Sequence, residues 1–358
     1  MSLDLFSPIS LGQIELSNRA VMAPLTRARA NPEDHMPNDL MVEYYAQRAS
    51  AGLLITECTM VKEGTSAFYA EPGIYNDQQI AAWKKVTDAV HAKGGKIVMQ
   101  IWHAGRACHP ELNQGATPVA ASAIAIENEQ VHTPSGKQNY TVPRALETSE
   151  IPEIVAAFKQ GAINAKAAGF DGIEVHGANG YLIDNFLRES SNQRTDQYGG
   201  SIENRARLLF EILDAVTEVW GNGRVGLRTS PLNGFNDMKD SDPVGLIRYL
   251  AEQVNRYDLA YWHVMRADFK GEQKADVIPT AREIYQGNLM TNMGYSKEEA
   301  NQVIANHQAD TVAFGVPFIA NPDLVERFKA DAPLNDAKPE LFYLGGAPGY
   351  TDYPRLDN

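Results

Sequence analysis

The stretch Gly172-Ile-Glu-Val-His176-Gly-Ala-Asn179-Gly-Tyr181 joins a short apolar run to a group of polar side chains. Short apolar runs bounded by glycine and polar residues are typical of fully buried parallel strands. We therefore expect a buried strand that ends at His176. His176 and Asn179 can then converge as two neutral donors, which suit an oxygen that gains negative charge during a reaction. The phenol of Tyr181 beside them suits delivery of a proton to a basic carbon.

Seven further runs of this kind recur along the chain, at Ala20–Ala23, Leu53–Thr56, Ile97–Gln100, Val225–Arg228, Ala260–His263, Asn288–Thr291 and Thr311–Phe314. Amphipathic helical patterns alternate with them, at Asp77–His91, Ile151–Ala168, Ser201–Trp220, Asp242–Arg256, Ser296–His307 and Asn321–Ala330. Eight strands alternating with helices over this length predict an α/β fold, the (β/α)₈ TIM barrel. A doubly wound sheet is the competing fold, although it usually has fewer strands and does not close.

Two segments lie outside this repeat. The segment Phe6–Arg19 reads as an N-terminal hairpin that turns at Gly12-Gln13 and could plug the barrel floor. The segment His103–Glu147 is too long for a plain loop, so we expect a capping excursion after the third strand. The chain contains no linker, and we therefore predict a single domain spanning residues 1–358.

The composition restricts the class of partner. A net charge of −13 argues against nucleic acid or an anionic membrane as a partner. No apolar run reaches about 18 residues, so we expect no membrane span. The start of the chain lacks the pattern of a signal peptide, which predicts a cytoplasmic location. The two cysteines, Cys58 and Cys108, have no metal or redox spacing, and no metal site is expected.

Polar and glycine residues collect where the expected strands end, which is the face that carries the active site in TIM barrels. The polar and glycine residues there include Thr26, Gln100, Arg228, Gly294 and Gly315, and Pro24, Leu25 and Trp102 stand beside them in the sequence. A buried arginine needs an anionic partner, which could be a ligand or a structural carboxylate. Gly294 and Gly315 follow the last two strands, where backbone N–H groups often bind phosphate, although both could be ordinary turn glycines.

Several other motifs have more than one interpretation. Taken singly, His176 could cap a loop and Tyr181 could pack in the core, but the trio with Asn179 favours a site. Gly221-Asn-Gly-Arg-Val-Gly226 matches a dinucleotide fingerprint, yet it precedes a strand instead of following one, and we read it as a turn. Phe68, Tyr69 and Tyr350 are aromatic candidates for a substrate pocket, and each could instead be core. Cys58 reads as a buried strand cysteine.

These residues resemble the old yellow enzyme family of flavin-dependent ene-reductases, closest to its bacterial branch of NADPH dehydrogenases and N-ethylmaleimide reductases. The matching motifs, in family order, are Ala23–Thr26, Gln100–Arg106, His176–Leu187, Ser191–Arg205, Phe314–Gly315, Pro317–Pro322 and Gly349–Pro354. The resemblance implies one FMN-binding TIM-barrel domain that reduces the C=C bond of α,β-unsaturated carbonyl compounds in a ping-pong reaction with NADPH or NADH. Nitro compounds are a further substrate class that it suggests.

The resemblance also implies residue roles. Tightly bound, non-covalent FMN would contact Pro24, Leu25, Thr26, Cys58, Gln100, Arg228, Gly294 and Gly315. His176 and Asn179 would bind the substrate oxygen, and Tyr181 would donate the proton. Phe68, Trp102 and Tyr350 would shape the substrate pocket. Enones, maleimides and phenols would be the ligands, and the protein would be a monomer or a homodimer.

One departure concerns the phosphate. Val316 stands where many members carry an arginine that contacts the phosphate, and Arg266 or a nearby lysine is a candidate to supply that charge. A second departure is Phe68, where many members have tyrosine, which leaves open whether Phe68 or Tyr69 faces the substrate. Two rival functions remain: a flavin-free barrel lyase or isomerase with His176 as base, and a non-enzymatic barrel that binds phenols or steroids.

Overall fold

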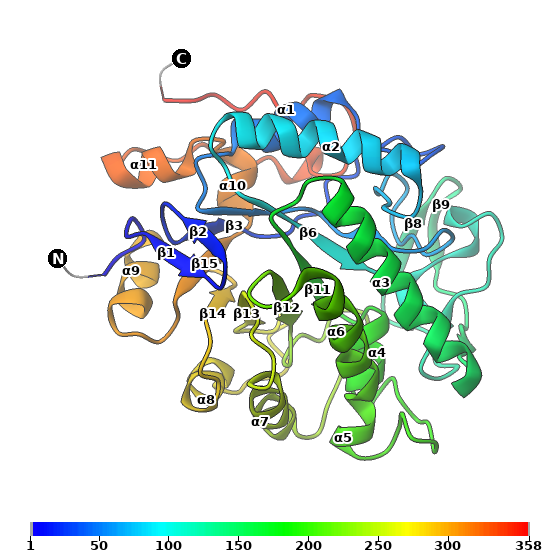
Figure 1. Ribbon diagram of the computed structural model, residues 1–358. Helices are drawn as coiled ribbons and strands as arrows, with labels where there is room; N and C mark the ends of the chain where they lie inside the picture. The colour runs from blue at the N-terminus through cyan, green and yellow to red at the C-terminus, as the bar shows by residue number, and fades with distance from the viewer. Residues whose placement is uncertain (1–2, 357–358) are drawn as a thin grey trace.

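The computed structural model describes residues 3–356 and contains a closed barrel of parallel strands (Figure 1). The eight barrel strands are β3 (Ala20–Met22), β4 (Leu53–Ile55), β6 (Ile97–Trp102), β11 (Gly172–Gly177), β12 (Val225–Thr229), β13 (Tyr261–Met265), β14 (Leu289–Asn292) and β15 (Thr311–Phe314). Each strand pairs with the next one along the chain, and β15 pairs with β3 to close the barrel. The prediction of a (β/α)₈ barrel is confirmed.

The second barrel strand is interrupted beside the third. A short continuation, β5 (Thr59–Met60), pairs with β6 as β4 does. In the gap, the hydroxyl of Thr56 accepts a hydrogen bond from the backbone N–H of Gln100 at 3.0 Å. A side chain therefore replaces a ladder bond there, and Cys58 is brought into the barrel wall.

Helices surround the barrel, and none within residues 3–356 is long and apolar enough to cross a membrane. They are α1 (Asp39–Gln47), α2 (Asp77–Ala92), α3 (Ile151–Ala167), α4 (Leu182–Leu187), α5 (Ile202–Arg205), α6 (Arg207–Trp220), α7 (Pro243–Val254), α8 (Val277–Ile284), α9 (Lys297–Ala305), α10 (Val316–Ala320) and α11 (Leu324–Ala330). Side-chain caps start several of them. Asn76 and Ser296, for example, accept hydrogen bonds from the first turns of α2 and α9.

The helix predicted at Ser201–Trp220 was wrong in one respect, because the structure divides it into α5 and α6 at Ala206. The break is held by Arg205, which is buried and donates hydrogen bonds to the carbonyls of Leu187 and Gly200. After α6, Gly221 has φ of +70°, and β12 follows. The glycine motif there is thus a helix stop and a turn, as predicted.

The N-terminal hairpin consists of β1 (Ile9–Leu11) and β2 (Ile14–Leu16), and it turns at Gly12-Gln13 as predicted. The backbone N–H of Gln13 donates to the carbonyl of Gly223, which precedes β12, at 2.8 Å. The apolar side chains of the hairpin pack into one cluster with the barrel interior. The hairpin therefore closes the floor of the barrel and leaves the opposite end for a site (Figure 1).

The excursion after β6 is also confirmed. It contains β7 (Val119–Ala120), β8 (Gln130–Thr133), β9 (Gly136–Asn139), β10 (Arg144–Ala145) and the 3₁₀ turns Gly105–Ala107 and Pro110–Leu112. Two further 3₁₀ turns lie outside it, at Thr148–Glu150 and Pro339–Leu341. Arg194 donates hydrogen bonds to the carbonyls of Ala121 and Leu146 and pairs with Asp196. This contact fixes both arms of the excursion, which gives the motif Ser191–Arg205 a structural role.

Candidate active site

The C-terminal ends of adjacent strands place the predicted polar residues side by side. Glu174 and His176 share one face of β11, because side chains alternate along a strand. In the ladders, Glu174 lies opposite Gln100 of β6, and His176 lies opposite Arg228 of β12. The sequence therefore brings His176, Gln100 and Arg228 together at the barrel mouth, as predicted.

His176 is held as a neutral donor. Its side chain is buried, and its Nδ1 accepts the backbone N–H of Ala178 at 3.3 Å. Nδ1 must then be unprotonated, so the ring proton resides on Nε2. Burial first, and then the charge of Arg228, hold the pKa of His176 well below its usual value. Nε2 can therefore donate a hydrogen bond to a ligand oxygen throughout the physiological pH range.

Asn179 follows in a left-handed conformation, with φ of +56°, which asparagine tolerates better than most residues. Its backbone N–H donates to the hydroxyl of Ser230 at 2.8 Å, and its carbonyl accepts from Asn236 at 2.9 Å. Its side-chain oxygen accepts from Asn233 at 2.9 Å. Among the described residues no acceptor is bonded to its Nδ2, so this group can donate beside His176.

Tyr181 completes the predicted trio. Its ring stacks on Trp102 at 4.6 Å between centroids and meets the ring of His176 edge-on at 5.2 Å. Burial raises the pKa of Tyr181 well above its usual value. The phenol therefore keeps its proton at neutral pH and can act only as a donor of it. Trp102 is fully buried and holds the ring in place.

The loop of this trio tolerates no side chain at Gly180, which has φ of +71°. A Cβ there would lie 2.6 Å from the Cβ of Asn236 and 2.9 Å from the carbonyl of Phe235. We expect Gly180→Ala to lower the free energy of unfolding by more than the ~1–2 kcal/mol that a left-handed conformation costs alanine. Gly200→Ala is the control, because Gly200 has φ of +84° with open space around it.

Denaturant unfolding of both variants measures this difference. If the two substitutions cost the same, the close approach between the loops after β11 and β12 makes no contribution. If Gly180→Ala costs more, the contact between the two loops is confirmed.

Below the trio lies a buried polar layer. The carboxylate of Glu174 accepts from Nε2 of Gln100 at 2.7 Å and lies 3.0 Å from Nδ1 of His263. Burial lowers the pKa of His263 more than Glu174 raises it, so a neutral imidazole donates to a carboxylate. Within residues 3–356, Oε1 of Gln100 and Nε of Arg228 are buried and have no hydrogen-bond partner. An unpaired acceptor and an unpaired donor therefore remain for a polar ligand.

One wall of the mouth comes from the segment after β3. Pro24, Leu25 and Thr26 are half-buried there, and the hydroxyl of Thr26 lies 3.7 Å from the sulfur of Cys58. Burial raises the pKa of the Cys58 thiol, which is therefore protonated and unreactive. These residues lie together at the barrel wall, as the sequence predicted.

Phe68 reaches the site, whereas Tyr69 is 57% exposed. Phe68 packs against the cluster that contains Trp102 and Tyr181. Buried Glu71 fixes its loop, because Oε2 of Glu71 accepts the N–H groups of Ala67 and Phe68 and the hydroxyl of Ser66. Burial raises the pKa of Glu71 to about 8.

The prediction for Tyr350 was wrong. Its ring is fully buried in the main core, stacked on Tyr44 at 4.0 Å and covered by the guanidinium groups of Arg27 and Arg29. The aromatic residue that the C-terminal segment brings to the site is Tyr343, which stacks on Phe68 at 6.1 Å. The sequence did not distinguish the two tyrosines, because the stacking and cation–π contacts that bury Tyr350 come from residues distant in the chain.

The loops after β14 and β15 are open to a ligand. Gly294 has φ of +68° and open space where a Cβ would lie, and Gly315 directly precedes α10. Val316 is 48% exposed at the start of that helix. Arg266 donates to the carbonyls of Met293 and Gly294 but is paired with Glu299. The candidate replacement for the missing arginine is therefore near the loop but already paired.

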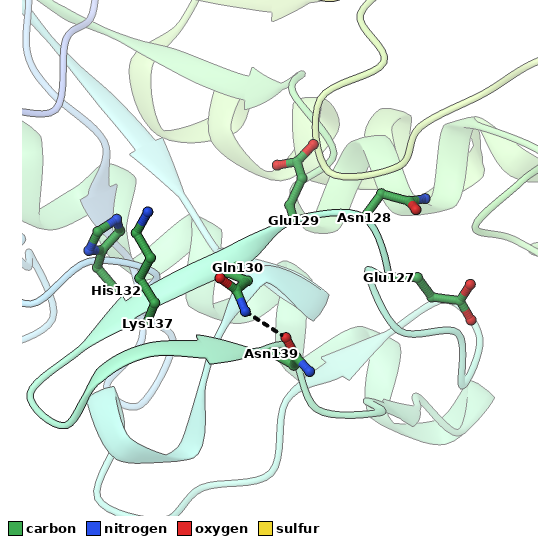
Figure 2. Close-up of a pocket in the computed structure, with 7 residues that line it drawn as sticks. All are labelled: Glu127, Asn128, Glu129, Gln130, His132, Lys137 and Asn139. Atoms are coloured by element: carbon green, nitrogen blue, oxygen red, sulfur yellow. Dashed lines mark hydrogen bonds between the residues drawn. The ribbon is translucent and has the colours of Figure 1, made fainter.

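A separate cavity of about 440 Å³ lies on the excursion and is lined by Glu127, Asn128, Glu129, Gln130, His132, Lys137 and Asn139 (Figure 2). Figure 2 shows Glu129 pointing away from Gln130 and Asn139. Its carboxylate contacts Lys270 at 2.7 Å and the N–H of Asn236 at 3.0 Å. These contacts tie the excursion to the loops after β12 and β13, and the cavity contains none of the predicted site residues.

Two donors, a protonated phenol and a buried arginine meet at the mouth of a TIM barrel, an arrangement that can polarise an oxygen and protonate a carbon beside it. Residues 4–335 match the model of the NADH:flavin oxidoreductase / NADH oxidase family. A probable flavin mononucleotide-dependent alkene reductase from Leishmania infantum is 50% identical over 359 residues, covering 98% of this chain and 97% of that protein.

Solved structures agree with this match. The old yellow enzyme from Trypanosoma cruzi has a TM-score of 0.96 at 44% identity and 99% coverage of both chains. Morphinone reductase in complex with tetrahydroNAD has a TM-score of 0.94 at 46% identity, covering 99% of this chain and 98% of that one. The chain belongs to the NADH:flavin oxidoreductase family and is an old yellow enzyme homologue. It is an FMN-dependent enzyme that reduces activated C=C bonds with a nicotinamide nucleotide.

Proposed function

We propose that His176, Asn179 and Tyr181 are the catalytic residues of an enone reductase. His176 and Asn179 bind the carbonyl oxygen of the substrate and stabilise the negative charge that develops on it. Tyr181 donates its proton to the α carbon. The observation that carries this proposal is that the acceptor atoms of both anchors are already occupied, Nδ1 of His176 by Ala178 and Oδ1 of Asn179 by Asn233. Both side chains therefore present donors.

The residues of the mouth fit FMN. The pyrimidine edge of its ring system has an N–H donor and carbonyl acceptors, which match the unpaired Oε1 of Gln100 and Nε of Arg228. Pro24, Leu25, Thr26 and Cys58 would contact the ring, and the backbone of Gly294 and Gly315 would bind the phosphate. The chemistry that bound FMN supplies is hydride transfer, from NADPH or NADH and then to the β carbon of the substrate.

The substrate pocket follows from the same packing. Phe68 and Tyr343 form an aromatic side of it, and Trp102 supports it through the ring of Tyr181. The ligands are small molecules with an acceptor oxygen: enones, maleimides and phenols, with nitro compounds as a further class. The proposal includes a single domain over residues 1–358, a monomer or homodimer, and a cytoplasmic location, where both buried thiols stay reduced.

Family membership favours neither rival function, the flavin-free lyase or the non-enzymatic phenol-binding barrel. The direct test uses the purified holoenzyme with 2-cyclohexenone and NADPH or NADH. We expect a flavin absorbance spectrum and one cyclohexanone formed for each nucleotide consumed. A flavin spectrum without turnover would support a binding protein instead, and a purified protein without a flavin spectrum and without cyclohexanone formation would support the first rival.

The exposed start of α10 allows a test of the phosphate site. Val316→Arg should tighten FMN binding, because a charge-assisted contact is stronger than a neutral one and Val316 is exposed enough to accept the longer side chain. The melting temperature at limiting FMN should rise, since FMN stabilises the folded state by mass action. Riboflavin, which lacks the phosphate, is the control. An equal gain for riboflavin would show that the phosphate does not bind at this loop.

A further inference from the structure

The amide of Asn179 has a donor end and an acceptor end, and only the donor end can bind a substrate oxygen. The two ends have nearly the same shape, so packing alone does not select between them. The backbone of Asn179 is held by Ser230 and Asn236, which leaves the rotation of its amide to be decided by what its side chain contacts. That contact is the side chain of Asn233.

The polarity of this contact is fixed from outside the site. Oδ1 of Asn233 faces the backbone N–H of Phe269 at 3.3 Å and that of Phe235 at 3.4 Å. A backbone N–H can only donate, so the oxygen of Asn233 must face these two groups. Its Nδ2 must then face Asn179, where it donates to Oδ1 at 2.9 Å. Nδ2 of Asn179 is consequently turned to the free side of the amide.

The groups that fix Asn233 are themselves rigid. Asn233 is fully buried in the loop after β12. Oδ1 of Asp268 accepts the N–H groups of Gly234 and Lys270 at 2.7 and 3.0 Å. Its other oxygen accepts the N–H groups of Glu272 and Gln273. Asp268 thereby binds the loop after β12 to the loop after β13, and the N–H of Phe269 is held where Asn233 needs it.

We propose that Asn233 is a positioning residue that holds the amide of Asn179 with its donor end toward the substrate oxygen. This inference rests on the proposed role of Asn179. A reversed Asn179 amide would place its NH₂ group against the NH₂ group of Asn233 and its oxygen against the substrate oxygen. The reversed state is therefore disfavoured, because it loses the hydrogen bond to Asn233 and also the hydrogen bond to the substrate.

Asn233→Asp reverses the polarity at nearly constant shape. One carboxylate oxygen still accepts the backbone N–H groups, and the other draws the NH₂ group of Asn179, which turns the oxygen of Asn179 toward the ligand. In the FMN holoenzyme, we expect the dissociation constants of p-hydroxybenzaldehyde and 2-cyclohexenone to rise by about tenfold or more. Repulsion by the new charge alone would weaken the phenolate but spare the neutral enone.

Asn233→Ala is the second variant, because it leaves the amide of Asn179 free to turn. It should raise the dissociation constants of both ligands less than Asn233→Asp does. The decisive measurement repeats both substitutions in an Asn179→Ala background, where they should have no further effect on the binding of the neutral 2-cyclohexenone. FMN content and melting temperature verify that each variant is folded.

The outcomes separate this inference from the proposed function. If Asn179→Ala alone leaves ligand binding unchanged, the proposed role of Asn179 fails. If Asn179→Ala weakens binding while both Asn233 variants bind normally, only the inference about Asn233 fails. If the Asn233 variants weaken binding equally with and without the side chain of Asn179, Asn233 supports the loop structurally and does not orient the amide.

Discussion

Tyr181→Phe is expected to slow the reduction of 2-cyclohexenone by about 10²–10⁴-fold, the usual contribution of a general acid. Reduction of the flavin by NADPH should stay near its normal rate, because the phenol takes no part in that half-reaction. Nitroalkenes should be affected less, since their nitronate products can leave without being protonated. The ring of Trp102 holds position 181 by stacking, which phenylalanine preserves.

Stopped-flow measurement of each half-reaction separately distinguishes these steps. Tyr198→Phe is the matched control, because its hydroxyl bonds to Glu211 away from the barrel mouth. Burial raises the pKa of Tyr181 well above 10, so the phenol stays protonated between about pH 6 and 9. The rate of the wild-type oxidative half-reaction should therefore not fall through ionisation of Tyr181 in this range. Equal enone rates for Tyr181→Phe and wild type would remove Tyr181 from the mechanism.

His176→Ala should lower the rate of enone reduction by about 10²–10³-fold, the typical cost of deleting one donor to a developing oxyanion. It should also weaken the binding of phenols and remove their long-wavelength absorbance band with oxidised flavin. The reason is that a bound phenolate loses one hydrogen-bond donor, which raises the pKa of the bound phenol. Asn179→Ala should act in the same direction. Both effects follow from donors that stay neutral, since burial and Arg228 keep the imidazole of His176 uncharged, with its single ring proton on Nε2.

Titration of each variant with p-hydroxybenzaldehyde measures both the dissociation constant and the band. His91→Ala serves as the control, because His91 lies at the end of α2 and contacts Asp171 outside the mouth. A band of normal intensity in both His176→Ala and Asn179→Ala would show that the ligand oxygen binds elsewhere.

The alternation of short apolar runs with amphipathic helical patterns was sufficient to predict the barrel. All eight apolar runs became barrel strands, and no strand end differs from the predicted run by more than two residues. The hairpin turn at Gly12-Gln13 and the long excursion after β6 were also predictable, because turn glycines and segment length are local properties. The division of Ser201–Trp220 at Ala206 was not predictable, because it depends on the hydrogen bond that Arg205 donates to the carbonyl of Leu187 in another segment.

The site shows the same boundary. The sequence by itself determined that His176 lies at the end of a strand and that Asn179 and Tyr181 follow that strand. The parallel ladder then places Gln100 and Arg228 beside them. Only the tertiary structure decided that Tyr343, and not Tyr350, stacks on Phe68, because Tyr44 and two arginines bury the latter tyrosine. It also decided which end of the Asn179 amide is bonded to Asn233, because the loop of Phe269 fixes the amide of Asn233. Residue types and strand order are properties of the linear sequence. Which group donates and which accepts in a side-chain hydrogen bond depends on partners that are distant in sequence.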